Sequence, residues 1–338
     1  MKKFVLAAAL LTALLFSGCA TSAENETTAH TREVFAMDTV MTLQAYGDHA
    51  ETALDEAVSE IERLDALFSI SSIDGDIARL NADKTLHASA DTVALLQRAE
   101  DIAASTGGLF DITIAPLMDA WGFTSGSYQV PDAATIANLL ANVDHTQVQL
   151  SGNTVTLPNN VTIDLGGIAK GFTSDRIMAI FSRCGVTSGV ISLGGNVQTL
   201  GEKPDGSLWR VGIQDPADTS RLLATLEVAN QAVITSGGYQ RFFEKNGVTY
   251  HHIIDPRTGY PADSGLTSVT IVSGDGTLAD GLSTALFIMG HDAAIDYWRS
   301  HRETFDMVLV EADGTVTISE GLNDNFTLNG DHTLESIQ

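Results

Sequence analysis

The sequence predicts an α+β fold, a single large domain in which helices pack on largely antiparallel sheets. Between His49 and Ser69, apolar residues recur at intervals of three and four, which is typical of a long amphipathic helix. Residues 208–274 instead hold a dense series of short runs rich in strand formers, and such close spacing favours antiparallel pairing. With 338 residues, 44% of them hydrophobic, the chain can bury a sizeable core.

The N-terminus predicts export and a lipid anchor. Two lysines precede an apolar run over residues 4–16, which is too short to span a bilayer and leads into Ser17-Gly18-Cys19. This pattern resembles a bacterial lipoprotein signal. The resemblance implies a signal peptide over residues 1–18, lipid on Cys19 and an extracytoplasmic protein held to a bacterial membrane through that lipid alone. A plain signal peptide or an apolar N-terminal helix is the alternative.

The remaining chain divides into a tether, a domain and a tail. Residues 19–32 are mostly small, polar or acidic, which favours a flexible tether. The domain is expected over residues 33–321, followed by a loose tail over residues 322–338. Its first elements are a strand over residues 33–46, the long helix and a second helix that is capped by Ser89 or Asp91 and ends at Gly107-Gly108. Further helices are expected over 132–142, 278–289 and 292–300, and strands over 161–163, 189–196, 208–213, 222–228, 232–235, 239–244, 248–254, 266–272, 307–311 and 315–319.

A glycine-rich connection lies near the middle of the chain, from Ile163 to Phe172. It is expected to join the short strand over residues 161–163 to a helix that runs through Ile177. The N–H groups and the positive dipole at such a helix start suit a phosphate, and Lys170 adds a positive charge. An ordinary glycine turn with a surface lysine is the alternative.

Charge and missing motifs narrow the function. The formal net charge of -25, from 43 acidic and 18 basic residues, disfavours binding to nucleic acid. An anionic ligand would therefore need a local cation, such as a lysine or a metal ion. The sequence also lacks the Walker, G-x-G-x-x-G, G-x-S-x-G, HExxH and paired CxxC motifs, so the common signatures of nucleotide-triphosphatases, dinucleotide-binding enzymes, hydrolases and zinc sites are absent.

Two polar groups could carry chemistry. Asp280 and Thr284 lie four residues apart at an expected helix start, so their oxygens share one face and suit a hard divalent cation. Stabilisation of the helix dipole by the aspartate is the simpler alternative. His251 and His252 end an expected strand, where a histidine could bind a ligand, act as a base or serve the structure.

These signals occur together with others in one order along the chain. The segments are Met37-Asp38-Thr39, Asn81, Thr106-Gly107-Gly108, Phe110-Asp111-Ile112-Thr113, Trp121-Gly122-Phe123, Asp164-Leu165-Gly166-Gly167-Ile168-Ala169-Lys170-Gly171, Leu193-Gly194-Gly195-Asn196, Thr235-Ser236-Gly237, His252-Ile253-Ile254-Asp255-Pro256-Arg257-Thr258-Gly259 and Ala279 through Ala285. In this order they resemble the ApbE-type FAD:protein FMN transferases, from about Val34 to Ser319. That family uses FAD to attach FMN, through a phosphoester, to a Thr or Ser of an acceptor protein, and it releases AMP and requires Mg²⁺.

The resemblance implies roles for individual residues. It places Mg²⁺ at the Gly167 carbonyl, Asp280 and Thr284. It places FAD against Met37, Leu109, Phe110, Asp111, Asp164, Lys170 and Ile254, with His252 near the nucleotide. Asp280 and His252 are both candidates to take the proton of the incoming hydroxyl. The family often has an aromatic residue where this chain has Ser71.

Two other functions fit the same sequence. A Mg²⁺-dependent FAD pyrophosphatase would transfer the flavin phosphate to water and release FMN and AMP. A non-catalytic lipoprotein would only bind FAD. The expected partners are FAD and, for the transferase, a transiently bound acceptor protein with a Ser/Thr flavinylation motif.

Overall fold

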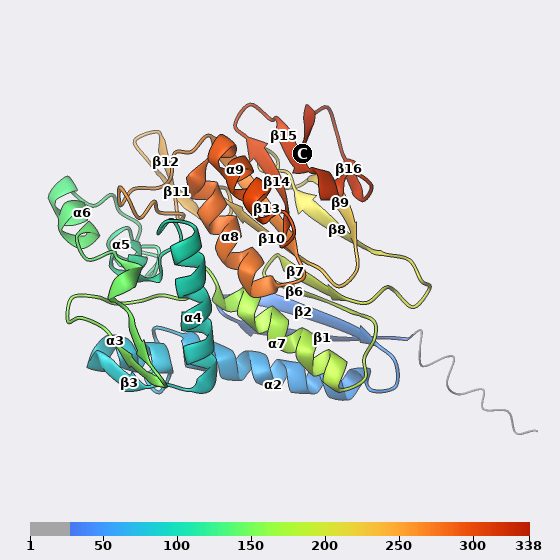
Figure 1. Ribbon diagram of the computed structural model, residues 1–338, viewed down its shortest axis with the longest axis horizontal. Coiled ribbons are helices and arrows are strands. Elements are labelled where there is room, and N and C mark those ends of the chain that lie inside the picture. The colour runs from blue at the N-terminus through green and yellow to red at the C-terminus, as the bar shows by residue number, and fades with distance from the viewer. Residues whose placement is uncertain (1–27) are drawn as a thin grey trace, which may run out of the picture.

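A computed structural model describes residues 28–338 of the chain (Figure 1). The predicted signal peptide over residues 1–18, lipidated Cys19 and most of the predicted tether lie outside the described residues. Within residues 28–338 no helix combines the length and the apolarity needed to cross a membrane.

The described residues form a nine-stranded sheet at the centre of the fold. Its neighbouring strands pair antiparallel, except that β15 and β17 pair parallel. This arrangement confirms the predicted α+β class. In spatial order the strands are β1 (Ala29–Ala36), β2 (Thr39–Tyr46), β6 (Gly189–Leu193), β7 (Asn196–Leu200), β10 (Ala232–Gly237), β13 (Leu266–Ser273), β14 (Asp306–Glu311), β15 (Val316–Ser319) and β17 (Leu334–Ile337).

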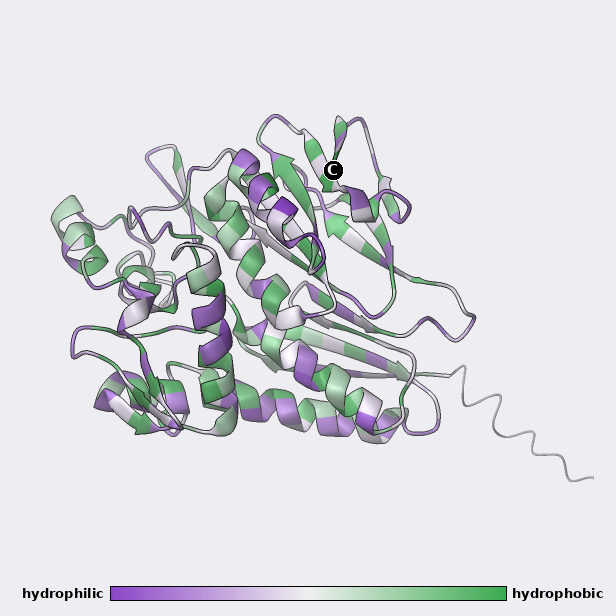
Figure 2. Cartoon of the chain, in the orientation of Figure 1, coloured by the Kyte–Doolittle hydropathy of each residue, from purple (hydrophilic) through white to green (hydrophobic). Residues whose placement is uncertain are grey.

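Long helices cover one face of this sheet (Figure 1). They are α2 (Ala50–Phe68), α7 (Ala169–Arg183), α8 (Gly276–Met289) and α9 (His291–His301). Hydrophilic and hydrophobic residues alternate around α2 in Figure 2, as expected for a helix with one buried face. A three-stranded sheet of β8 (Trp209–Gln214), β9 (Leu222–Val228) and β16 (Phe326–Leu328) packs on the opposite face through a shared apolar cluster. The central sheet is therefore covered on both sides.

Further elements lie outside these layers. They are α3 (Asp76–Asp83), β3 (Thr85–His87), α4 (Ala90–Ser105), η1 (Ile112–Ile114), α5 (Ala115–Ala120), α6 (Ala133–Leu140), η2 (His145–Gln147), β4 (Gln149–Ser151), β5 (Thr154–Thr156), β11 (Phe242–Lys245) and β12 (Val248–His251). Ser89 caps α4 by accepting a hydrogen bond from the Thr92 N–H. Of the two predicted caps, Ser89 and Asp91, the structure therefore has Ser89. The long helix and the final helix pair begin and end close to their predicted bounds.

The predicted first strand over residues 33–46 is wrong, because the structure has a hairpin there. Met37 and Asp38 adopt positive φ angles of 48° and 58° and reverse the chain between β1 and β2. Met37-Asp38 is not one of the common turn dipeptides, so the turn could not be recognised from the sequence. The strand also begins at Ala29, so the predicted tether over residues 19–32 is too long at its C-terminal end.

The predicted strand over residues 161–163 is also wrong. Asn81 takes the place of a strand partner, because its side-chain amide bonds both the carbonyl and the N–H of Ile163, each at 2.8 Å. The segment is therefore extended and held without belonging to a sheet.

The predicted loose tail over residues 322–338 is ordered in the structure. β16 pairs with β9, and β17 adds to the edge of the central sheet beside β15. Phe326 and Leu328 pack against the apolar cluster between the two sheets. Burial of these side chains supplies the free energy that orders the segment.

Candidate active site

A cavity of about 410 Å³ lies where α7, α8 and the loops around them meet. It is lined by all the residues to which the family resemblance gives a role in binding the ligand or metal or in catalysis. These are Met37, Leu109, Phe110, Asp111, Asp164, Gly167, Lys170, His252, Ile254, Asp280 and Thr284. Segments that are far apart in the sequence are thus brought to one place, although their roles there remain predictions.

A second cavity of about 450 Å³ shares a wall with the first. Met37, Asp164 and Gly166 line both, and Ser71 lies in the second. Lys170 and Arg241 are the Lys and Arg side chains of both linings. We call the two cavities together the two-lobed cleft. A ligand that spans it would pass both cations at the junction of the lobes.

The start of α7 leaves some backbone donors open and engages others. The Gly166 N–H donates to Asp164 Oδ1 at 2.6 Å, and the Gly171 N–H donates to Asp280 Oδ2 at 2.8 Å. Within residues 28–338 the N–H groups of Gly167 and Lys170 have no hydrogen-bond partner. The expectation of a phosphate-binding helix start therefore applies to these two N–H groups, and the Gly166 N–H is already engaged.

Asp280 is held rigidly between two elements. Its Oδ2 accepts from the Gly171 N–H of α7, and its Oδ1 accepts from Asn196 Nδ2 at 2.9 Å. The side chain is buried, and burial raises the pKa of Asp280, although the positive charge of Lys170 acts in the opposite direction. Each carboxylate oxygen keeps a lone pair beyond these bonds, so the group can still bind a cation.

The close contact of α7 with α8 depends on Gly171. A Cβ on this residue would lie 2.2 Å from the Gly276 carbonyl oxygen and 2.6 Å from the Asp280 Cβ. Only glycine therefore lets the two helices approach closely enough for the Gly171 N–H to reach the Asp280 carboxylate.

The dipole-based alternative for Asp280 does not hold. α8 begins at Gly276, earlier than predicted, so Asp280 lies beyond the first turn. Asp275 caps the helix by accepting from the Leu278 N–H, and Asp175 of α7 accepts from the N–H groups of Gly276 and Thr277. Because other carboxylates satisfy the start of α8, Asp280 is not needed to stabilise that helix end.

The donor atoms around Asp280 fit Mg²⁺. Thr284 lines the same cavity one turn along α8, where its Oγ1 lies 3.2 Å from Ser236 Oγ, and the exposed Gly167 faces the cavity as well. Carboxylate, hydroxyl and carbonyl oxygens are the hard ligands that Mg²⁺ prefers. Residues 28–338 contain no cluster of three or more His, Cys, Asp or Glu that could hold a metal ion. A metal at Asp280 would therefore need phosphate oxygens or water to complete its shell.

The two neighbouring histidines differ in their hydrogen bonds. His251 accepts from the Ile253 N–H at Nδ1, and its Nε2 lies 3.0 Å from the Ala262 carbonyl, so both ring nitrogens serve the structure. His252 Nδ1 lies 3.1 Å from the Arg241 carbonyl, which can only accept. The proton of the neutral ring is therefore assigned to Nδ1, and Nε2 keeps a free lone pair.

The cavity also sets the protonation of His252. Burial lowers the pKa of His252 to about 4, and the nearby positive charges of Arg241 and Lys170 act in the same direction. The ring is consequently neutral near pH 7 and able to accept a proton.

Asp111 lines the cavity, and its carboxylate also forms hydrogen bonds within the protein. Its Oδ1 accepts from the N–H and the hydroxyl of Thr113, and its Oδ2 accepts from the His145 N–H. These bonds shape the turn after Leu109 and Phe110, and burial raises the pKa of the Asp111 carboxyl. The carboxylate is thus engaged within the turn, which it holds against the cavity.

Asn196, Arg241 and Ser236 also line the cavity, although no role for them was predicted from the sequence. Asn196 orients Asp280, and its place after Gly194-Gly195 was the one available signal. The Arg241 guanidinium donates to the Phe123 carbonyl at the junction of the lobes. The position of Arg241 at this junction depends on tertiary contacts, which the sequence does not show.

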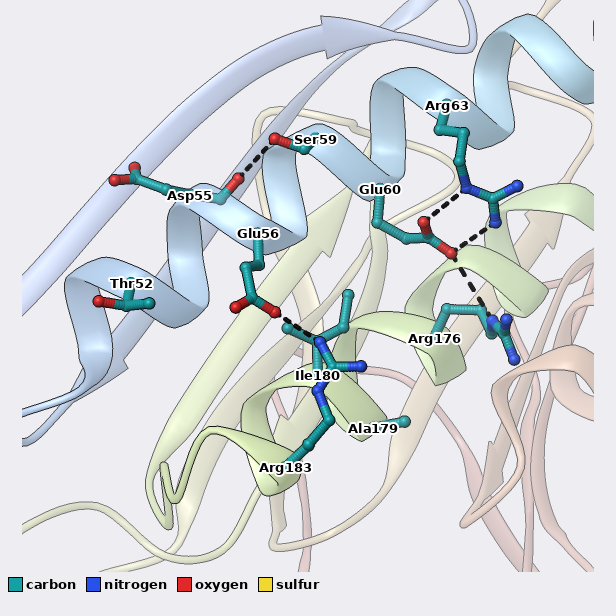
Figure 3. A pocket seen from close by; sticks show the side chains of 10 residues that line it. All are labelled: Thr52, Asp55, Glu56, Ser59, Glu60, Arg63, Arg176, Ala179, Ile180 and Arg183. Atoms are coloured by element: carbon teal, nitrogen blue, oxygen red, sulfur yellow. Dashed lines mark hydrogen bonds and ion pairs between the residues drawn. The ribbon is translucent and has the colours of Figure 1, made fainter.

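A groove of about 730 Å³ between α2 and α7 is larger than either lobe of the cleft. Figure 3 shows Glu56 and Glu60 of α2 facing Arg183 and Arg176 of α7. Asp91 joins this network by accepting from both Arg63 and Arg176. The groove contains none of the predicted site residues, and its arginines are paired with carboxylates, so it fastens α7 to α2.

The chain is similar to several known proteins. Residues 37–309 match the family model of the ApbE family. A FAD:protein FMN transferase of Treponema pallidum (strain Nichols) is 34% identical over 298 residues, which cover 80% of this chain and 80% of that protein. Another from Klebsiella pneumoniae (strain 342) is 33% identical over 278 residues, covering 80% of this chain and 86% of that protein. The crystal structure of the ApbE protein of Thermotoga maritima has a TM-score of 0.81 and 31% identity, and the match covers 87% of this chain and 98% of that one. The chain therefore belongs to the ApbE family.

Proposed function

We propose that this chain is an FAD:protein FMN transferase that works in the two-lobed cleft. The relatives described above carry that name, and the sequence predicts the same activity. The observation that carries the proposal is the junction of the lobes, where Lys170 and Arg241 lie beside Asp280 and His252. In this acidic chain, two cationic side chains lie together at the junction of the lobes. An elongated dinucleotide that spans the cleft would place its pyrophosphate there.

The reaction exchanges the phosphoanhydride bond of FAD for a phosphoester. A Ser or Thr hydroxyl of the acceptor protein attacks the phosphorus that belongs to the FMN half of FAD. The bond from this phosphorus to the bridging oxygen breaks, and AMP leaves with that oxygen. The acceptor keeps FMN through a new phosphoester, and the proton of its hydroxyl must go to a base.

His252 is the base that the geometry favours. Its Nε2 lone pair is free, while both oxygens of Asp280 already accept hydrogen bonds. The lowered pKa keeps the ring neutral and ready to accept the proton at neutral pH. We therefore propose His252 as the base, whereas the sequence left Asp280 and His252 as alternatives.

The remaining groups would bind charge and hold geometry. Lys170, with the open N–H groups of Gly167 and Lys170, can donate to pyrophosphate oxygens. Asp280, Thr284 and the Gly167 carbonyl would hold Mg²⁺, which supplies neutralisation of the charge on the phosphates. Asn196 and Gly171 keep the Asp280 carboxylate in one orientation.

The N-terminal sequence supports an extracytoplasmic location. We propose that Cys19 is lipidated after removal of residues 1–18 and that the lipid anchors the enzyme to a bacterial membrane. Labelled palmitate incorporated into the wild-type chain, and lost in Cys19→Ala, would support this, whereas equal incorporation would contradict it.

The activity is tested on the chain from Ala20 onward with FAD, Mg²⁺ and an acceptor protein that has a Ser/Thr flavinylation motif. In-gel flavin fluorescence and AMP release are followed together. A fluorescent acceptor band that disappears with EDTA is the expected result. AMP release without labelling would favour the pyrophosphatase, and bound FAD without either signal would favour the non-catalytic carrier.

A further inference from the structure

The β11–β12 hairpin forms a separate two-stranded sheet beside the cleft. A two-residue turn at Asn246 and Gly247 joins its strands, and both residues have positive φ angles, 54° and 77°, as a type I′ turn requires. Within residues 28–338 neither strand pairs with a third. The hairpin therefore has two outer edges.

The ladder register shows which backbone groups face outward. The His252 N–H donates to the Arg241 carbonyl, so these two residues form a hydrogen-bonded pair. Hydrogen-bonded and non-hydrogen-bonded pairs alternate in an antiparallel ladder. Glu244 and Thr249 oppose each other in a non-hydrogen-bonded pair, as do Phe242 and His251. The N–H and C=O groups of Phe242 and Glu244 consequently point away from β12, along the outer edge of β11.

The two outer edges differ at the end nearest the cleft. Beyond β12 the chain pairs with residues 260–262, because the Ala262 N–H donates to the Ile253 carbonyl and the Asp255 N–H donates to the Tyr260 carbonyl. A strand added to β12 would meet this pairing. The edge of β11 meets no such pairing among the described residues.

The open edge leads to the reacting groups. β11 starts directly after Arg241, which lines both lobes, and β12 ends directly before His252, which lines the cavity that holds Asp280. Glu244 and Arg241 are three residues apart, or about 10 Å along a strand. An extended segment paired with Phe242 and Glu244 would therefore deliver its next residues to the cavity rim.

The hairpin is also rigid and apolar enough to bind a chain. Phe243 stacks on Tyr250 and on Tyr128, with ring centroids 5.3 Å apart in each case. Around this stack, Phe242 and Val248 on the hairpin are exposed by 46% and 49%. Exposed apolar side chains beside an unpaired strand edge are typical of a surface that binds another chain.

We propose that the outer edge of β11 binds an extended segment of the acceptor protein as a third strand, antiparallel or parallel, and so brings its Ser or Thr hydroxyl to His252. This proposal rests on the proposed transferase function, which requires a protein chain to reach the cavity. Backbone pairing supplies affinity without reading the side chains of the segment, as in other cases of strand addition.

Two proline variants of the chain from Ala20 onward test the edge. Glu244→Pro removes an outward N–H of β11, and Thr249→Pro removes the outward N–H directly opposite on β12. Neither change removes a bond within the hairpin. With the acceptor protein varied in concentration, we expect Glu244→Pro to raise the KM for the acceptor about tenfold or more, since a backbone pair is lost and the proline ring obstructs the edge. Thr249→Pro should leave that KM within about twofold of the wild type.

Two further readouts separate this proposal from the function itself. FAD affinity, measured by flavin fluorescence, should be the same in both variants and the wild type. An equal KM for the acceptor in both variants would overturn the proposal. If the wild type labels no acceptor, docking is measured instead by hydrogen exchange on the Asp280→Ala chain. Docking at this edge requires that the acceptor protect the backbone amides of Phe242 and Glu244 from exchange. Exchange that is unchanged there would also overturn it.

Discussion

The two-lobed cleft and the groove between α2 and α7 are both hollow and lined by charged residues, but they differ in how far their polar groups have partners. In the groove, Glu56, Glu60 and Asp91 each bond an arginine, so the network is internally neutralised. In the cleft, the Gly167 N–H and the His252 Nε2 atom have no partner within residues 28–338, and burial raises the pKa of Asp280. Unused hydrogen-bonding capacity, more than volume, distinguishes a site that acts on a ligand from one that holds helices together.

The largest difference between the two regions should appear when a carboxylate is removed from each. Asp280→Ala should lower Mg²⁺-dependent AMP release by about a thousandfold, because several kcal/mol of charge stabilisation are lost at the phosphates. Glu56→Ala removes a carboxylate from the groove and should leave the rate within about twofold. Near-normal AMP release by Asp280→Ala would contradict the metal assignment.

Removal of the proposed base should have the next largest effect. His252→Gln should lower transfer by about a hundredfold, whereas His251→Gln, at a ring that serves the structure, should cost less. Because the pKa of His252 is lowered to about 4 from an ordinary value near 6.5, the wild-type rate should stay flat from pH 8 to about pH 5 as far as this group is concerned. It should fall only as the pH approaches 4. An acid limb centred near 6.5 that disappears in His252→Gln would show that the ring has an ordinary pKa.

The lowered pKa of His252 also predicts how the free energy of unfolding depends on pH. The unfolded chain takes up a proton at His252 near pH 6.5, whereas the folded chain does so only near pH 4. The contribution of this group to the free energy of unfolding is therefore present above pH 6.5 and is lost as the pH falls toward 4. Urea unfolding of the wild type and His252→Gln at both pH values measures it, and a difference that does not change with pH would contradict the assignment.

The contact of α7 with α8 should be sensitive to a single methyl group. Gly171→Ala should cost about 1–3 kcal/mol in the free energy of unfolding, since its Cβ would clash with the Gly276 carbonyl oxygen, and it should also impair transfer by moving Asp280. Gly281→Ala is the comparison within α8, because the atoms nearest to its Cβ belong to the side chain of Ile102, with Cδ1 at 2.8 Å, and not to the backbone of a neighbouring helix. Urea unfolding and AMP release check both variants, and equal losses would argue against a special role for Gly171.

The smallest effect is expected in the groove. Arg176→Ala removes the bond to Asp91 and the longer contact with Glu60, and these partly exposed ion pairs should contribute about 0.5–1 kcal/mol together. The loss should shrink in high salt because screening weakens exposed charge pairs. A tenfold loss of transfer by this variant would show that the groove takes part in function.

The difference between local patterns and tertiary contacts explains which features could be predicted from the sequence. The amphipathic helices, the antiparallel class and the residues of the cleft were accessible, because periodicity and short motifs are local properties. The hairpin turn at Met37 and Asp38 lacks a common turn dipeptide, and Asn81 holds Ile163 across a separation of 82 residues. Such features depend on tertiary contacts that a linear pattern does not contain.

Individual site residues show the same limit. Asp280 was identified, but its partners Gly171 and Asn196 come from two other segments and became apparent only in the fold. Asp111 lines the cavity as the resemblance implies, but the bonds of its oxygens to Thr113 and His145 were not apparent from the sequence. A motif identifies which residues gather at a site, and the hydrogen bonds distinguish those that hold the site from those left free to react.

Intact-mass spectrometry of the acceptor, combined with quantification of AMP, tests the central claim most directly. The wild-type chain with FAD and Mg²⁺ should add the mass of one FMN less one water to the acceptor and release one AMP for each acceptor modified. Asp280→Ala should do neither, and Glu56→Ala should match the wild type. AMP released in excess while the acceptor keeps its original mass would contradict the claim, because the cleft would then transfer the flavin phosphate to water.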